Sequence, residues 1–146
     1  MAGQFAYTIG IDKIGLNLYY DDIEVTEWND LKCCSMRQKK GEQPAKEFLL
    51  SLDKKMRAKM VDTISILQDN GYELLEPYSK HLSEGIFELR AKLGTDITRV
   101  LYFFYVDRHI ILTNGFIKKT NKTPTKEIER AKKYRSDYLR RKEEEK

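Results

Sequence analysis

Cysteine is scarce in this chain of 146 residues: Cys33 and Cys34 are the only two, and they are adjacent. Adjacent thiols have neither the spacing of a metal site nor the geometry of a structural disulfide. Long apolar runs are also lacking, because the longest, residues 100–106, is far shorter than the roughly 20 residues that span a bilayer. No basic stretch followed by an apolar one opens the chain, so we predict a cytoplasmic protein without a signal peptide or a membrane segment.

Several catalytic motifs are missing as well. The chain has no glycine-rich phosphate loop, no zinc-binding spacing and no nucleophile elbow. Its acidic residues are scattered along helical stretches, which suits solvation better than a two-metal nuclease. We therefore expect neither a metal nor a cofactor.

Charge, in contrast, is abundant and unevenly placed. Of the 27 basic and 23 acidic residues, residues 1–35 hold two and six, which leaves 25 and 17 in residues 36–146. This surplus of positive charge favours an anionic partner, nucleic acid first and an acidic protein second, although a solvated surface without a partner has the same composition.

Two helices are predicted first. Pro44 suits the first turn of a helix that places Phe48 and Leu52 on one face. Asp53 caps a second helix with apolar residues at helical spacing, and Gly71 supplies its stop. Together they predict a helical hairpin.

Three strands follow, over residues 86–90, 98–106 and 109–116, with Asp107-Arg108 as a tight turn between the last two. The middle strand is apolar on both faces, so we expect it at the centre of the sheet. Thr123-Pro124 then opens a charged helix.

The fold class predicted is α+β: a small antiparallel sheet with the helical hairpin packed on one face, and a carboxy-terminal helix. Residues 36–146 form the predicted domain. Residues 1–35 form an extension whose alternating apolar residues fit either an appended β-hairpin or a leader.

Cations stand at the ends of these strands. Arg90 and Arg99 lie on neighbouring strands, which are within about 5 Å of each other, so both reach one phosphate if they are registered on the same face. Arg99 opens an apolar strand, where a guanidinium must either pair with a carboxylate or face a cleft. An ion pair with Glu88 is the equally weighted alternative for Arg90.

Three lysines follow the last strand: Lys118, Lys119 and Lys122 lead to the start of a helix, where amide donors also attract anions. Such a loop is more often an ordinary solvated surface. The cationic blocks together are more specific than any one of them.

Four stretches resemble the phage-derived, HigB-like branch of the RelE/ParE toxin superfamily. They cover Ser79-Lys80-His81-Leu82, Gly85 to Arg90, Arg99 to Phe104, and Gly115 to Thr120 running on to Pro124. The resemblance extends over about residues 41–138 and excludes residues 1–35.

The resemblance implies a microbial-ribonuclease-like fold and the toxin of a type II toxin-antitoxin system, which cleaves mRNA on the ribosome and is neutralised by a cognate antitoxin. The implied endoribonuclease reaction is metal-independent attack of a ribose 2′-hydroxyl on the adjacent phosphate. It requires a base, an acid, and cations around the phosphorane. Our candidates for phosphate stabilisation are four cations: Arg90, Arg99, Lys118 and Lys119.

The general base is left open. Ile86 and Glu88 stand where well-characterised members place lysines, and no tyrosine closely follows Lys118-Lys119. Lys80 or Lys119 exchanges the proton if nearby cations depress its pKa, and His81 is the other candidate. For RNA binding we add Lys122 and, as a ring that stacks on a base or is plain core, Tyr102.

A ParE-like toxin that inhibits a protein such as DNA gyrase without catalysis is the main rival, and a basic binding module is the third reading. Convergence of Arg90, Arg99 and Lys118 or Lys119 in one open concavity is required by the nuclease alone. If Arg99 is instead locked away in a closed ion pair, the enzymatic interpretation fails and only the family resemblance is left. The sequence predicts no oligomeric state.

Overall fold

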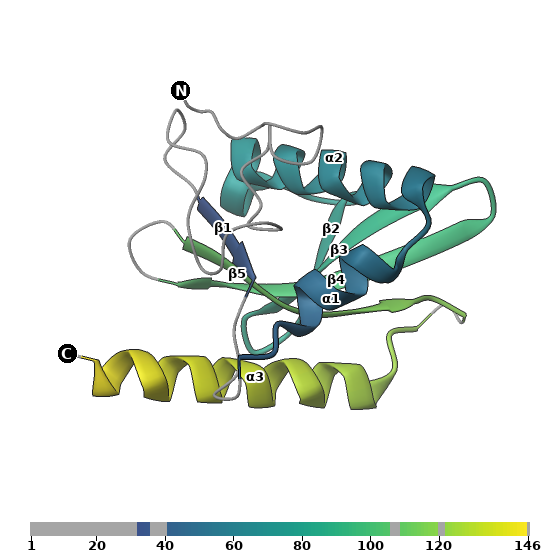
Figure 1. The fold of residues 1–146 in the computed structure, drawn as a ribbon. Helices are drawn as coiled ribbons and strands as arrows, with labels where there is room; N and C mark the ends of the chain where they lie inside the picture. Colours follow the sequence, from purple (N-terminus) through teal and green to yellow (C-terminus); the bar gives the residue numbers. More distant parts are fainter. Residues whose placement is uncertain (1–31, 36–40, 106–108, 120–121, 146) are drawn as a thin grey trace, which may run out of the picture.

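The computed structural model describes residues 32–35, 41–105, 109–119 and 122–145 (Figure 1). In chain order its elements are β1 (Lys32–Ser35), α1 (Pro44–Ser51), α2 (Lys54–Asn70), the short 3-10 helix η2 (Gly71–Glu73), β2 (Ser79–Ser83), β3 (Ile86–Leu93), β4 (Asp96–Tyr105), β5 (His109–Ile117) and α3 (Thr125–Glu144). This arrangement confirms the predicted α+β class. The predicted turn at residues 107–108 and the alternating stretches before residue 32 lie outside the described residues.

The sheet runs in the order β1-β5-β4-β3-β2. Strands β2 to β5 form an antiparallel meander, and β1 joins its far edge parallel to β5, with Lys32 opposite His109. Residues 32–35, which were predicted to belong to the amino-terminal extension, are thus part of the sheet. The domain boundary before residue 36 stays a prediction.

The two predicted helices form as their end signals require. The Asp53 carboxylate accepts a hydrogen bond from the Met56 amide at 3.0 Å, which caps α2. Gly71 ends α2 with φ of 56°, a backbone region that glycine occupies without strain. Both helices lie over one face of the sheet, while α3 runs along the opposite face (Figure 1).

Two apolar cores fill the space on either side of the sheet. Strand β4 supplies both, because its side chains alternate between the faces. Val100 and Tyr102 belong to the core under α1 and α2, and Leu101 and Phe103 belong to the core under α3. The prediction of a central strand that is apolar on both faces is therefore confirmed.

Strand β2 was not predicted. It lies at the edge of the sheet beside β3, where Lys80 faces Glu88 and His81 faces Phe87. Its sequence is polar, because an edge strand is covered on fewer sides than a central one.

The turn that joins β2 to β3 is tied to α3. Lys132 on α3 contacts the Glu84 carboxylate at 2.5 Å, and Arg135 donates to the Glu84 carbonyl oxygen. Within the described ranges, no helix is long and apolar enough to cross a membrane.

Candidate functional site

The sheet register brings the two predicted arginines together. Arg90 on β3 lies directly opposite Arg99 on β4, so both side chains leave the same face. Lys118 follows β5 and is held there because its amide donates to the Ile97 carbonyl oxygen at 2.8 Å. Arg90 and Arg99 on two neighbouring strands and Lys118, directly after the next strand, thus meet at one end of the meander.

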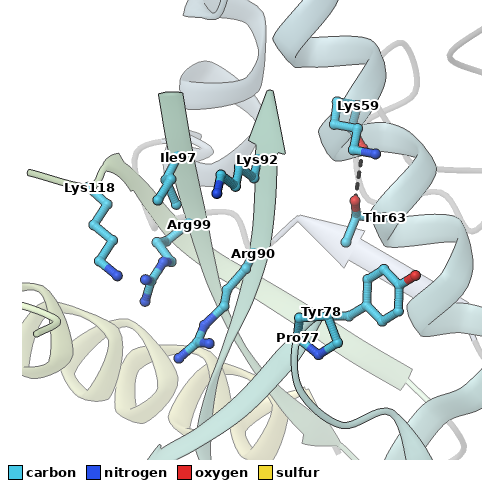
Figure 2. A pocket seen from close by; sticks show the side chains of 9 residues that line it. All are labelled: Lys59, Thr63, Pro77, Tyr78, Arg90, Lys92, Ile97, Arg99 and Lys118. Carbon is cyan, nitrogen blue, oxygen red and sulfur yellow. Dashed lines mark hydrogen bonds between the residues drawn. The ribbon is translucent and has the colours of Figure 1, made fainter. Parts of the chain in front are cut away.

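Two cavities adjoin this group, and Arg90 and Arg99 line both. The first, here the Tyr78 cavity, is about 370 Å³ and is also lined by Lys118, Lys92, Lys59 and Tyr78. Figure 2 shows the charged ends of Lys118, Arg99 and Arg90 directed toward one side, with Tyr78 on the other side of Arg90 and its ring directed away from those charged ends. The second, the Lys80 cavity, is about 390 Å³ and includes Lys80, His81, Glu88, Lys122 and Thr123.

Arg99 forms an ion pair with Glu88 inside the protein. Glu88 is 0% exposed and Arg99 2%, and one guanidinium nitrogen of Arg99 donates to both carboxylate oxygens. The Thr123 hydroxyl donates to the same carboxylate at 2.7 Å. These hydrogen bonds offset the free-energy cost of removing the two charges from water. A buried ion pair without further hydrogen bonds does not recover that cost.

This pair corrects the role given to Arg99. Its guanidinium is buried and bonded to Glu88, so it is not the open phosphate-binding group that was predicted. Arg99 nevertheless lines both cavities, and its Nε is buried without a hydrogen-bond partner among the described residues. Its charge acts on the cavities at short range through a medium that screens it less than water does.

Arg90 remains the accessible member of the arginine pair. Its side chain is partly exposed, with Nη1 3.4 Å from the Glu76 carboxylate and Nε 3.9 Å from Glu88. The predicted ion pair with Glu88 is therefore present, but at the outer limit of such contacts. The paired side chain also borders both cavities, so the RNA-facing role of Arg90 stays a prediction.

Lys118 has the most perturbed environment of the predicted lysines. Partial burial, followed by the positive charges of Arg99 and Arg90, lowers the pKa of its amine below the ordinary lysine value. Glu88 opposes this shift, and Lys80 adds to it. Lys118 is therefore easier to deprotonate than a solvated lysine. Lys119, the next residue, is exposed and lines neither cavity.

Lys80 and His81 come from the edge strand β2. Lys80 faces Glu88 across the β2–β3 pair, and both Lys80 and His81 are exposed and line the Lys80 cavity together with Lys122. The His81 Nε2 accepts a hydrogen bond from the Gly85 amide at 3.1 Å, which leaves that nitrogen engaged.

Residues 47–136 match the family described as phage-derived Gp49-like proteins (DUF891). The chain belongs to the Gp49-like family. That family is associated with RelE-like toxins, which supports the broader part of the resemblance. No curated protein matches the chain.

The Gp49-like segment contains the whole cationic group, from Lys59 on α2 to Lys122 ahead of α3. It also contains Glu88 and Thr123, which sequence reasoning did not place in the site. Glu88 could have been found from its place on a strand between the apolar residues Phe87 and Leu89, because a carboxylate that is buried there needs a charged partner.

One prediction within the Gp49-like segment is wrong. Tyr102 was a candidate for stacking on RNA bases, but it is 1% exposed and its hydroxyl hydrogen bonds to that of Ser79 at 2.5 Å. Its ring stacks on Phe87 inside the core under α1 and α2. The alternative reading of Tyr102 as plain core is the correct one, because β4 is covered on both faces.

Among the described residues, no group of three or more histidine, cysteine, aspartate or glutamate side chains is placed to hold a metal ion. The candidate site is thus a set of cations around one buried carboxylate. Such a set suits an anionic ligand, and it offers a perturbed amine for proton exchange.

Proposed function

We propose that this Gp49-like protein is the toxin of a type II toxin-antitoxin system of the HigB-like kind and cleaves mRNA in the cytoplasm. The observation that carries the proposal is the meeting of three cations: Arg90 and the buried Arg99, which line both cavities, and Lys118, which lines the Tyr78 cavity. A phosphate between the cavities has a cation on each side and room for the nucleotides that flank it.

The reaction needs only groups that this chain supplies. The ribose 2′-oxygen attacks the adjacent phosphorus, the bond from phosphorus to the 5′-oxygen breaks, and a 2′,3′-cyclic phosphate remains. The base takes the 2′-hydroxyl proton, and an acid returns one to the leaving 5′-oxygen. Arg90 stabilises the negative charge that develops on the phosphorane, and Lys122 contributes from the rim of the Lys80 cavity.

Lys118 is the residue we assign as general base. Its pKa is lowered by burial and by the neighbouring arginines, so the free amine that accepts a proton is more available than in ordinary lysine. The candidates for the acid are Lys80 and His81. Both line the Lys80 cavity, which Arg90 at the proposed phosphate position also borders. Lys119 lines neither cavity, so we give it no direct role.

Arg99 acts from behind the site in this proposal. Its pairing with Glu88 fixes a positive charge beneath the cavities, where it repels the protonated form of Lys118. Arg99 is thus a positioning residue that affects the proton transfer through Lys118.

Primer extension on a translated message after induction of the protein tests the proposal. Discrete cuts within codons are expected for the wild type, and Lys118→Ala should reduce cleavage by roughly 100- to 10,000-fold, the usual contribution of a positioned base. Lys133→Ala, an exposed lysine on α3 that lines neither cavity, is the charge-matched control. Intact message during growth arrest contradicts the proposal.

A second function is favoured by one specific observation. Arg99 is buried in an ion pair with Glu88, so this predicted phosphate-binding residue does not contact a ligand directly. That is expected for a toxin that does not cleave RNA. Such a ParE-like toxin inhibits a protein target, for example DNA gyrase. Growth arrest with intact message and with loss of plasmid supercoiling distinguishes this function from mRNA cleavage.

Partners follow from the proposed function. A cognate antitoxin protein neutralises the toxin, and mRNA on the ribosome is its substrate. The surplus of positive charge in residues 36–146 is compatible with both an acidic antitoxin and RNA. Co-purification of the chain with the product of the adjacent gene, with relief of growth arrest, tests the first partner.

A further inference from the structure

The two cavities beside the arginine pair differ in chemistry. The Tyr78 cavity combines an apolar part, formed by Tyr78, Pro77 and Ile97, with the cations Arg90 and Lys118. The Lys80 cavity is bordered mainly by polar and charged side chains and has no phenol or phenyl ring. An aromatic face next to cations suits a planar ring joined to an anion, which is the chemistry of a nucleotide.

Tyr78 is held in place beside the cations. Its carbonyl oxygen accepts a hydrogen bond from the Arg90 amide at 2.8 Å, so the backbone of Tyr78 is bonded to the strand that carries Arg90. Tyr78 is 43% exposed and lines the same cavity as Arg90, with the two side chains extending in different directions (Figure 2). An accessible ring on an anchored backbone is a ready stacking surface.

A second exposed tyrosine provides a comparison. Tyr72 is 71% exposed, but its ring lies against Phe104, with ring centroids 3.9 Å apart, and it does not line the Tyr78 cavity. Exposure alone therefore does not mark the site. The distinguishing feature of Tyr78 is that it lines the same cavity as Arg90 and Lys118.

We propose that the Tyr78 cavity binds the nucleobase of a nucleotide next to the reacting phosphate, with the base stacked on Tyr78. This inference rests on the proposed function, because it places the phosphate at Arg90 and Lys118. The volume of about 370 Å³ falls within the range of roughly 300–1,000 Å³ of small-ligand sites. Stacking tolerates every base, so Tyr78 contributes affinity more than sequence preference.

The arrangement gives each of the two flanking nucleotides its own cavity beside the arginine pair. One base occupies the Tyr78 cavity, and the other nucleotide extends into the Lys80 cavity, which Arg90 also borders. A ring that holds one base while cations hold the phosphate fixes the attacking hydroxyl in line with the bond to be broken.

Binding of an uncleavable RNA tests the inference without relying on catalysis. The probe is a 2′-O-methyl oligonucleotide, whose blocked hydroxyl cannot attack, and inorganic polyphosphate serves as a polyanion without bases. Tyr78→Ala and Tyr78→Leu should bind the oligonucleotide roughly 5- to 100-fold more weakly than the wild type, the usual effect of losing one base–aromatic stack. Polyphosphate binding should not change, which also shows that the variants fold.

The controls are Tyr78→Phe, which keeps the ring, and Tyr72→Ala, which removes an exposed ring elsewhere; both should bind like the wild type. The proposal is overturned if Tyr78→Ala binds the oligonucleotide normally, if it loses polyphosphate binding equally, or if the wild type does not bind the oligonucleotide. Message cleavage with binding that is independent of Tyr78 removes the base site but keeps the nuclease. Tyr78-dependent binding without cleavage does the reverse.

Discussion

At the scale of single residues, the site depends on one buried carboxylate. Glu88 has no contact with solvent, and its partners Arg99 and Thr123 come from another strand and from the segment before α3. Removing either charge leaves the other buried and uncompensated, which is far less favourable than keeping both.

We expect Glu88→Gln to lower the free energy of unfolding by about 3–5 kcal/mol, because the positive charge of Arg99 loses its partner inside the protein. Urea denaturation measures the change. Glu76→Gln, which removes the exposed partner of Arg90, should change stability by no more than about 1 kcal/mol. Equal effects of the two substitutions would show that the Glu88 carboxylate is not buried in an ion pair.

Lys118 should produce a pH dependence of stability with a defined sign. Its pKa is lower in the folded protein than in the unfolded chain, where lysine titrates near 10.4. Between these two values the unfolded chain binds more protons at this site, so stability rises with pH. At neutral pH the amine is charged in both states, and this charge lowers the stability of the folded protein relative to the unfolded chain.

Lys118→Met should therefore raise stability relative to the wild type at neutral pH, and this gain should diminish as the pH passes through the lowered pKa toward 10.4. Unfolding curves at a series of pH values measure it, with Lys133→Met as the matched control. A gain that is the same at every pH would assign the effect to packing instead of charge.

At the scale of elements, α1 packs closely against β5 because Gly115 has no side chain at the contact. A methyl group added at Gly115 would overlap the ring of Phe48 on α1. Because the ring leaves no room for it, the Phe48 side chain or α1 itself must shift before Gly115→Ala can be accommodated.

We expect Gly115→Ala to destabilise the protein by about 1–3 kcal/mol, as overpacking of a close contact does. Thermal or urea unfolding provides the measurement. Adding Phe48→Leu should recover part of the loss, which a double-mutant cycle detects as coupling between the two positions. Additive effects would contradict direct contact.

The sequence predicted elements with local end signals better than elements that depend on neighbours. Asp53 and Gly71 marked the ends of α2 because a cap and a positive φ are local requirements. Strand β2 was missed because Ser79–Ser83 is short and polar, and β1 because four residues carry too little pattern. Both exist because longer strands pair with them.

The candidate site was predictable to a similar degree. Strand order and period placed Arg90 and Arg99 on one face, and the register confirms it. The burial of Tyr102 and the pairing of Arg99 with Glu88 depend on which surfaces the helices cover, and no local pattern reports that.

At the scale of the whole molecule, charge is divided along the chain. Residues 36–146 carry a surplus of positive charge that attracts a polyanion over long range. The six acidic residues among residues 1–35 weaken that attraction. Replacing these six by their amides, without shortening the chain, changes this balance alone.

We expect this amide variant to bind an uncleavable RNA more tightly than the wild type at low salt, since it presents a larger net positive charge. The difference should shrink as ionic strength rises toward 1 M, where the screening length falls to about 3 Å. Fluorescence anisotropy at several salt concentrations measures both effects. A difference that is independent of salt would point to a specific contact made by these residues.

The Thr123 hydroxyl that contacts Glu88 belongs to the stretch of chain before α3. A growing polypeptide acquires this residue only after both charged partners on β3 and β4 have been made. The anion-binding centre therefore acquires this partner only after the strands that carry its charges, and a fragment interrupted before Thr123 has the charges without the hydroxyl that contacts Glu88.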